Sequence, residues 1–240
     1  MNSQLTFGLP SGNLQVDGQY RGKSRCMVNL TKRQQDILVG TILGDGCLEV
    51  NGKYVRLKVD HNIKQKQLTD WIFNEFRNFC SKRPYFLDQS DVRTNKSYHH
   101  YRFSTLSSPV LNKYYLMFYQ LNRKIVPENI KTLLKSSLSL AVWYMDDGFR
   151  RLDCNGIYLC TSAFTNLEQL LLIETLKVNF NLDARVHWAA GNARIYIPSS
   201  SAKMFCNLIK EYVLSDLSYK LISDPVTTRP LYRGPMEGTR

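Results

Sequence analysis

Two aspartates occupy matching places in two apolar stretches of this chain. The stretch 37–46 ends in Asp45 and a glycine, and the stretch 139–148 ends in Asp147 and a glycine. The carboxyl end of a helix carries partial negative charge and unpaired carbonyl groups, so an aspartate there is unfavourable unless a cation lies nearby. Hard divalent cations prefer carboxylate and carbonyl oxygens. We therefore expect two helix ends to present both carboxylates to metal, although either aspartate alone would more simply form a surface Asp-Gly turn.

The first of these stretches carries helix signals at both ends and two glycines inside. Thr31 and Gln34 have the spacing of a capping box, and Gly46 is expected to end the helix. Gly40 and Gly44 are interior positions, where glycine costs about 1 kcal/mol relative to alanine. Their four-residue spacing places them on one face. We expect a second helix backbone to approach closely there.

Strand and helix patterns follow each apolar stretch in the same order. Apolar and charged residues alternate in 54–60, which predicts a strand with one buried and one largely basic face. Further strands are expected within 84–105, 157–162 and 185–197, and helical patterns occur at 68–79, 110–121, 165–180 and 202–214. The repeat predicts an α+β fold of two αββαββα units with pseudo-two-fold symmetry. Two antiparallel sheets would lie side by side, with helices on one face and basic side chains on the other.

The composition narrows the class of protein. The 240 residues carry a net charge of +12 with 43% hydrophobic residues, which indicates a folded protein with a polyanionic partner, most commonly nucleic acid. No apolar run approaches the roughly 20 residues that span a bilayer, so no membrane role is expected. The six cysteines form no C-x-x-C pair, which argues against structural zinc or disulfides and favours a reducing compartment. We expect an N-terminal arm at 1–30, halves at 31–134 and 135–222, and a C-terminal tail at 223–240.

The two stretches resemble the paired motifs of the LAGLIDADG homing endonucleases in their single-chain, intron-encoded form. The matching windows are 38–46 and 140–148, and the segments 124–127 and 219–221 are similar to further landmarks of that family. The resemblance covers roughly residues 31–222. The second motif departs at Val142, where the family usually has glycine, and at Asp146, which stands where the first motif has Gly44. Looser or different helix packing is expected there.

The resemblance implies a monomer whose motif helices form the interface between the halves. Asp45 and Asp147 would bind Mg²⁺ or Mn²⁺, helped by the backbone carbonyls of Gly44 and Asp146, while Ca²⁺ would support DNA binding without cleavage. The Asp146 carboxylate has no assigned role, and ordinary aspartate pKa values suffice for metal ligands. The sheets would form a saddle on double-stranded DNA, and each half would cut one strand to leave short 3′ overhangs.

Lysines and a set of basic residues complete the expected site. Lys124 and Lys220 follow their respective aspartates at comparable spacing, and we expect them to stabilise charge at the scissile phosphate or to polarise water. His99 and His100 are expected to be strand or loop residues. The expected DNA contacts, which could instead be only a soluble sheet face, are Lys53, Arg56, Lys58, Arg93, Lys96, Arg102, Arg150, Arg151, Arg185, His187 and Arg194.

These observations favour a site-specific, metal-dependent DNA endonuclease that promotes intron mobility. An intron-encoded protein of this kind would act in a mitochondrion or chloroplast, and otherwise inside the cell. One alternative is a splicing maturase that binds intron RNA, and a second is a DNA-binding protein that does not cleave. Retention of both aspartates and both lysines argues against the second alternative.

Overall fold

The structure is a computed structural model that describes residues 29–91, 96–189 and 191–222. Most of the expected N-terminal arm, all of the expected tail and Arg93 lie outside these residues. The first half contains α1 (Lys32–Leu43), β1 (Cys47–Asn51), β2 (Tyr54–Asn62), α2 (Lys66–Glu75), β3 (Tyr85–Asp91), β4 (Lys96–Ser104) and α3 (Pro109–Phe118). The second half contains α5 (Ser137–Asp147), β7 (Gly148–Arg150), β8 (Ile157–Cys160), α6 (Asn166–Phe180), β9 (Arg185–Ala189), β10 (Asn192–Ile197) and α7 (Ser199–Ile209).

Short elements join and finish the halves. A hairpin of β5 (Tyr119–Gln120) and β6 (Arg123–Lys124) and the helix α4 (Ile130–Leu133) form the connection. Three 3₁₀ turns, Ile63–Gln65, Arg77–Phe79 and Ser215–Lys220, complete the described chain. Asn179 on α6 donates hydrogen bonds to the carbonyl oxygens of Lys131 and Leu134 at 2.9 and 2.7 Å, so α4 is held against α6. The division at residue 134 therefore stays a prediction.

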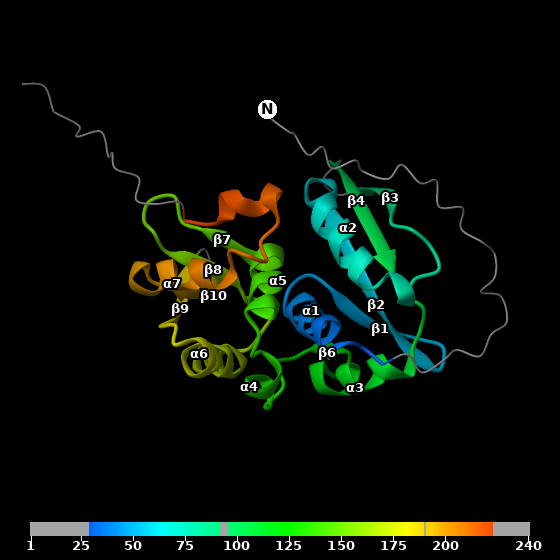
Figure 1. Ribbon diagram of the computed structural model, residues 1–240, viewed down its shortest axis with the longest axis horizontal. Helices are drawn as coiled ribbons and strands as arrows, with labels where there is room; N and C mark the ends of the chain where they lie inside the picture. The colour runs from blue at the N-terminus through cyan, green and yellow to red at the C-terminus, as the bar shows by residue number, and fades with distance from the viewer. Residues whose placement is uncertain (1–28, 92–95, 190, 223–240) are drawn as a thin grey trace, which may run out of the picture.

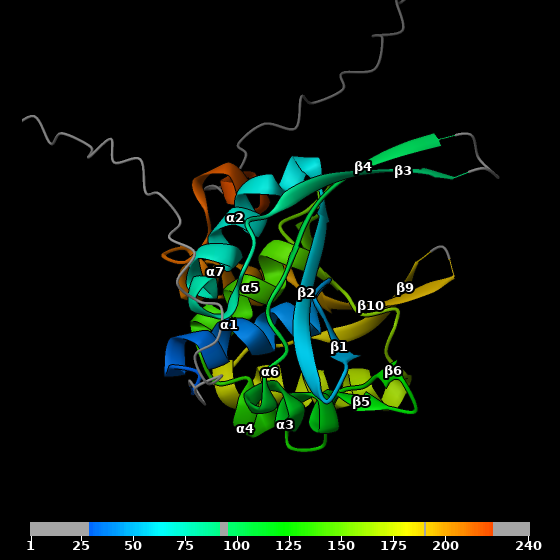
Figure 2. The same ribbon diagram turned by 90° about the vertical axis from the view of Figure 1, so that its right-hand side faces the viewer.

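The two main sheets have the same topology. Their strand orders are β1-β2-β4-β3 and β7-β8-β10-β9, and every neighbouring pair is antiparallel. The halves lie on either side of α1 and α5, which stand together at the centre (Figure 1). The helices lie on one side of the molecule, and the β3–β4 and β9–β10 hairpins project on the other (Figure 2). The predicted α+β fold with tandem αββαββα units is confirmed.

Helices α1 and α5 pack closely because glycines of α1 lie directly against larger residues of α5. A Cβ atom at Gly40 would overlap the Ser139 carbonyl oxygen and lie 2.7 Å from Cβ of Val142. At Gly44 it would lie 2.6 Å from Cβ of Asp146. The expected close approach is confirmed, and the contact is not looser at Val142, since this side chain is fully buried over the glycine.

The end of α1 differs from the sequence prediction. The capping box at Thr31 and Gln34 is present with both of its hydrogen bonds, but the helix stops at Leu43 and Gly44 is its C-cap. The Gly44 N–H reaches Gly40 O at 3.1 Å, and the Gly46 N–H turns back to Thr41 O at 3.0 Å. Gly46 therefore ends the following turn and not the helix, which leaves Asp45 outside the helix.

The part of the chain that the structure describes contains neither a membrane-spanning helix nor a disulfide. No helix in residues 29–91, 96–189 and 191–222 is long and apolar enough to cross a membrane. The five cysteines of this part of the chain are free thiols.

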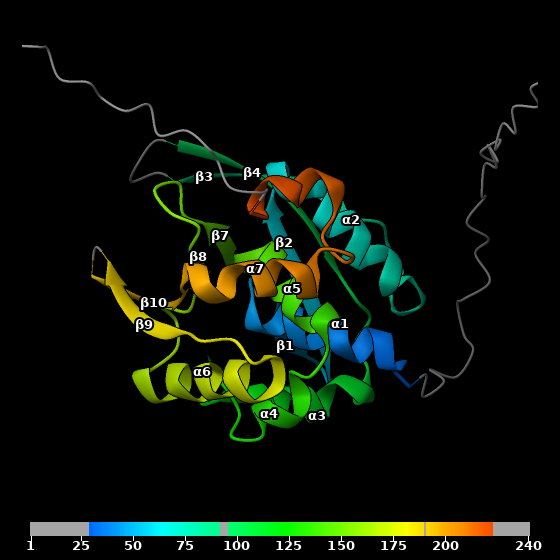
Figure 3. The same ribbon diagram turned by 60° about the vertical axis from the view of Figure 1, so that its left-hand side comes forward.

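Figure 3 shows the second half from another side, with α6 and α7 covering the sheet that contains β9 and β10.

Candidate active site

Asp45 and Asp147 lie at the adjoining carboxyl ends of α1 and α5. Asp147 is the last residue of α5, and Asp45 is in the turn after α1. The backbone N–H of Asp45 donates to Oδ2 of Asp146 at 2.8 Å, which fixes the two ends against each other. The arrangement therefore places both motif aspartates in one acidic site with Asp146.

The carboxylates of this site repel one another. Burial, together with the charges of Asp45 and Asp146, raises the pKa of Asp147 to about 7. The pKa of Asp45 is raised by the same two causes, burial and Asp146, even though one side of this residue is open to solvent. Both pKa values are raised because burial and neighbouring negative charge disfavour the charged forms of these carboxyl groups. Concentrated, oxygen-rich negative charge fits a hard divalent cation, which would relieve the repulsion.

Both predicted lysines reach the motif ends. Lys124 Nζ donates to the carbonyl oxygens of Gly44 at 2.8 Å and Gly46 at 2.9 Å, while Lys220 Nζ donates to Met145 O at 2.6 Å. Burial lowers the pKa of each lysine, and the nearby aspartates oppose that shift. Gly44 O is thus already engaged by a lysine, although a carbonyl oxygen has a second lone pair. Its service as a metal ligand stays a prediction.

Two local structures position these lysines. The β5–β6 hairpin turns through Leu121 and Asn122 with φ of 49° and 62°, and Tyr119 Oη accepts the Leu48 N–H at 2.9 Å. The 3₁₀ turn Ser215–Lys220 is tied to α5 because Tyr144 Oη donates to Lys220 O at 2.6 Å. Each lysine is therefore held by the segment that follows the last main helix of its half, the β5–β6 hairpin for Lys124 and the Ser215–Lys220 turn for Lys220.

Sequence reasoning missed His61 and the side chain of Asp146. Nε2 of His61 lies 2.8 Å from Oδ1 of Asp146, and both side chains are completely buried. Burial alone would lower the pKa of His61, but the nearby carboxylates, Asp146 foremost with Asp45 and Asp60, together raise that pKa. The signal was present in the alternation of β2, since continuing it past Asp60 places His61 in the buried register.

The first-half sheet presents its basic side chains together with carboxylates. Arg56, Lys58 and Arg102 lie on the face opposite the buried residues of β2. Nη2 of Arg56 is 3.0 Å from Oε1 of Glu49, and Nε of Arg102 is 3.4 Å from Oδ2 of Asp60. The remaining candidates of this half are Lys53 in the β1–β2 turn and Lys96 at the start of β4.

The second-half sheet surrounds its basic groups with aromatic rings. The guanidinium of Arg185 lies 5.2 Å from the Tyr196 ring centre, and that of Arg194 lies 5.5 Å from the Phe149 ring centre. Arg151 lies over Tyr158 and Tyr196 at 5.6 and 5.7 Å. Nδ1 of His187 is 2.8 Å from the Tyr158 hydroxyl.

Arg150 does not share this face with Arg151. In the β7–β8 ladder Arg150 is the partner of the buried Ile157, whereas Phe149 is the partner of Tyr158. The Arg150 charge is also close enough to affect Tyr144, which belongs to the covering helix. Successive strand residues point to opposite faces, so the ladder sets Arg150 on the side of Ile157, and its expected DNA contact stays a prediction.

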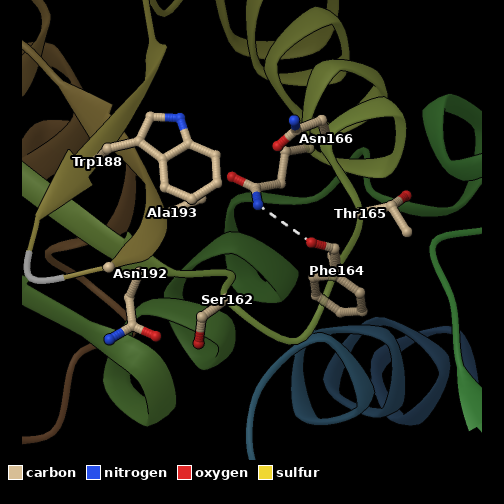
Figure 4. A pocket seen from close by; sticks show the side chains of 9 residues that line it. Ser162, Phe164, Thr165, Asn166, Trp188, Asn192 and Ala193 are labelled. Atoms are coloured by element: carbon tan, nitrogen blue, oxygen red, sulfur yellow. Dashed lines mark hydrogen bonds between the residues drawn. The ribbon is translucent and has the colours of Figure 1, made fainter.

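A separate depression lies beside the β9–β10 hairpin. It is lined by Ser162, Phe164, Thr165, Asn166, Gln169, Trp188, Gly191, Asn192 and Ala193 (Figure 4). Within it Gln169 Nε2 donates to Phe164 O at 3.1 Å. It contains none of the candidate catalytic residues and no acidic side chain, so we assign it no chemical role.

Comparisons with known proteins agree with this geometry. The model of the LAGLIDADG DNA endonuclease family matches residues 35–205. The chain is 26% identical over 198 residues to probable intron-encoded endonuclease 1 of Wickerhamomyces canadensis, covering 80% of this chain and 85% of that protein. It is 26% identical over 211 residues to DNA endonuclease I-ChuI of Chlamydomonas applanata, covering 81% and 96%. The solved structure of the homing endonuclease I-WcaI bound to its DNA recognition sequence matches with a TM-score of 0.76 at 25% identity, covering 81% and 88%.

Proposed function

This chain belongs to the LAGLIDADG DNA endonuclease family, and we propose that Asp45 and Asp147 are the metal-binding carboxylates with which it cuts both strands of DNA. The chain is a site-specific DNA endonuclease, in keeping with its family and its named relatives. The observation that carries the assignment is the convergence of four predicted residues, two aspartates and two lysines, at the carboxyl ends of α1 and α5.

The side chains of this site divide the work of phosphodiester hydrolysis. Divalent cations held by Asp45 and Asp147 would activate water and stabilise the leaving 3′-oxygen. Lys124 and Lys220 lie at the same motif ends as the carboxylates, where their ammonium groups can stabilise charge that develops on the phosphate. Their hydrogen bonds to motif carbonyls hold both ammonium groups in place before DNA arrives.

The two open sheet faces form the proposed DNA saddle. The arginines of the first half are braced by carboxylates, and those of the second half by aromatic rings. Bracing limits the rotamers of these side chains, which suits bidentate contacts to base edges. A net charge of +12 supplies the attraction for phosphates.

Cleavage of an intronless duplex tests this function. A duplex that joins the two sequences flanking the gene's intron is incubated with the purified protein and Mg²⁺, and both product ends are mapped. We expect one cut in each strand with short 3′ overhangs, no cut with EDTA, and binding without cutting in Ca²⁺. An intact duplex in Mg²⁺ that is nevertheless bound would contradict cleavage and favour the non-cleaving alternative.

Four finer points belong to the same proposal. The protein would act as a monomer, use Mg²⁺ or Mn²⁺, and work in a mitochondrion or chloroplast if its gene lies in an organellar intron. Binding of the host intron RNA stays a prediction. Tight binding of that RNA together with failure to cut the intronless duplex would favour the maturase.

A further inference from the structure

The internal repeat makes His61 and Thr161 equivalent residues. His61 Nδ1 lies 2.9 Å from Thr69 Oγ1, and Thr161 Oγ1 lies 3.2 Å from Gln169 Oε1. Each pair is separated by eight residues and reaches the helix that follows, from within β2 for His61 and from the residue directly after β8 for Thr161. The repeat thus has a histidine in the first half where the second half has a threonine.

His61 reaches across the interface to the second motif. Its Nε2 lies 2.8 Å from Asp146 Oδ1, while Asp146 Oδ2 accepts the backbone N–H of Asp45 at 2.8 Å. The two atoms are within salt-bridge distance but not in aligned hydrogen-bond geometry, since neither has a hydrogen-bond partner within the described chain. A continuous path therefore runs from β2, through α5, to the backbone of Asp45.

Among the residues that the structure describes, no equivalent chain of contacts leads from Thr161 to the first motif. The residue that matches Asp146 in the first motif is Gly44, which has no side chain to offer Thr161. Asp147 is instead held by its own helix, since α5 extends through Asp147 whereas α1 ends at Leu43. The two aspartates are thus fixed by different means, Asp147 by a helix and Asp45 by a neighbour from the other half.

We propose that His61 is a positioning residue for Asp45: its contact holds the Asp146 carboxylate, which holds the Asp45 backbone, so that cutting of one DNA strand depends on His61 far more than cutting of the other. The inference rests on the proposed function, in which each half cuts one strand. Asp45, His61 and Asp146 offer ligand atoms within 4.8 Å of one another. Each Asp146 oxygen already has one protein contact, so a cation there would have to share these oxygens with the imidazole and the Asp45 amide.

The variants distinguish a positioning role of His61 from a general loss of stability. H61Q removes the charge and keeps a polar side chain, and H61T installs the residue that the second half uses. The matched control is H99Q, because His99 also contacts an aspartate, with Nδ1 2.7 Å from Asp88 Oδ1, but this pair is exposed. D146N is a further test, since its amide oxygen can still accept the Asp45 N–H while the ion pair is lost.

The first readout needs neither metal nor activity. Hydrogen exchange of the Asp45 amide is measured in the metal-free proteins, with the Asp147 amide in α5 as internal reference. Loss of one hydrogen bond corresponds to about tenfold faster exchange. We expect that acceleration at Asp45 in H61Q and H61T, a smaller one in D146N, and none in H99Q. Unchanged exchange at Asp45, or equal acceleration at Asp45 and Asp147, would overturn the proposal.

The second readout resolves the two DNA strands. A duplex carrying a different fluorophore on each 5′ end is cut under single-turnover conditions in Mg²⁺. H61Q should slow one strand about tenfold more than the other, so that nicked duplex accumulates, with DNA affinity close to that of the parent. Equal slowing of both strands would contradict the inference. A parent protein that cuts neither strand would defeat the proposed function instead, and the exchange measurement would still decide the role of His61.

Discussion

Lys124 Nζ lies 2.8 Å from the carbonyl oxygen of Gly44, a residue 80 positions earlier, and so ties the β5–β6 hairpin to the end of the first motif helix. A buried ammonium beside three carboxylates is positioned for charge stabilisation as well as for capping. Lys220 repeats this relationship in the second half through Met145 O.

Replacing either lysine should therefore slow chemistry more than binding. We expect K124M and K220M each to reduce the single-turnover cleavage rate about 10²-fold, because one group that stabilises transition-state charge is lost. DNA affinity, measured in Ca²⁺, should be nearly unchanged. K210M is the control, since Lys210 is exposed at the end of α7. A cleavage rate equal to that of the parent would remove the lysine from the site.

The raised pKa of Asp147 makes metal-free stability depend on pH. Its pKa is about 7 in the folded protein and near the ordinary aspartate value when unfolded, so the folded state binds the proton more tightly. Stability is therefore lost as pH rises from about 4 to about 7. D147N should raise the melting temperature at pH 8 by roughly 5–10 °C, equivalent to about 2–3 kcal/mol after allowance for partial exposure, and change it little at pH 5.

Metal and a surface substitution provide the comparison for that experiment. Mg²⁺ should stabilise the parent more at pH 8 than at pH 6, because binding must release the Asp147 proton. D216N alters an exposed aspartate and should show no such pH-dependent difference. Equal melting temperatures of D147N and parent at pH 8 without metal would contradict the idea that the charged Asp147 carboxylate destabilises the folded protein.

Close packing of the motif helices predicts a large cost for a single methyl group. G40A should destabilise the protein by about 2–3 kcal/mol in chemical denaturation, because the new Cβ overlaps the Ser139 carbonyl oxygen. G52N is the control, since Gly52 has φ of 69° with open space around it and asparagine tolerates that conformation. A neutral G40A variant would show that the helices can separate without penalty.

The basic sheet faces predict a steep salt dependence of DNA binding. The logarithm of the association constant should fall linearly with the logarithm of salt concentration, reflecting counterions released from phosphates. K58A on the open face of β2 should reduce the slope by about one if Lys58 contacts a phosphate. K113A, on the covering helix α3, should leave the slope unchanged. A flat response for the parent would argue against the saddle.

Much of the fold is predictable from local sequence patterns, because the same order of helix and strand patterns occurs in both halves. The capping box at Thr31 is visible as spacing in the sequence, and it forms in full. Gly40 and Gly44 indicated a close helix contact because interior glycine is costly unless a backbone lies against it. The alternation in β2 gave its buried and open faces.

The errors arose where a tertiary contact decides the outcome. The partner of Asp146 lies 85 positions earlier in β2, and the strand had been ended at Asp60, so neither His61 nor its ion pair was found. The face on which Arg150 lies depends on the register of β7 against β8, which local sequence does not show. The raised pKa of Asp147 also has no local sequence signal, because burial at the helix interface depends on both halves.

The metal-binding role of the two aspartates is the central claim, and strand-resolved cleavage by D45N and D147N tests it most directly. Both variants keep the shape of the side chain and lose the charge that holds a divalent cation. We predict that neither produces double-strand breaks in Mg²⁺, while both retain sequence-specific binding of the intronless duplex. Double-strand cleavage at the parent rate by either variant would contradict the assignment.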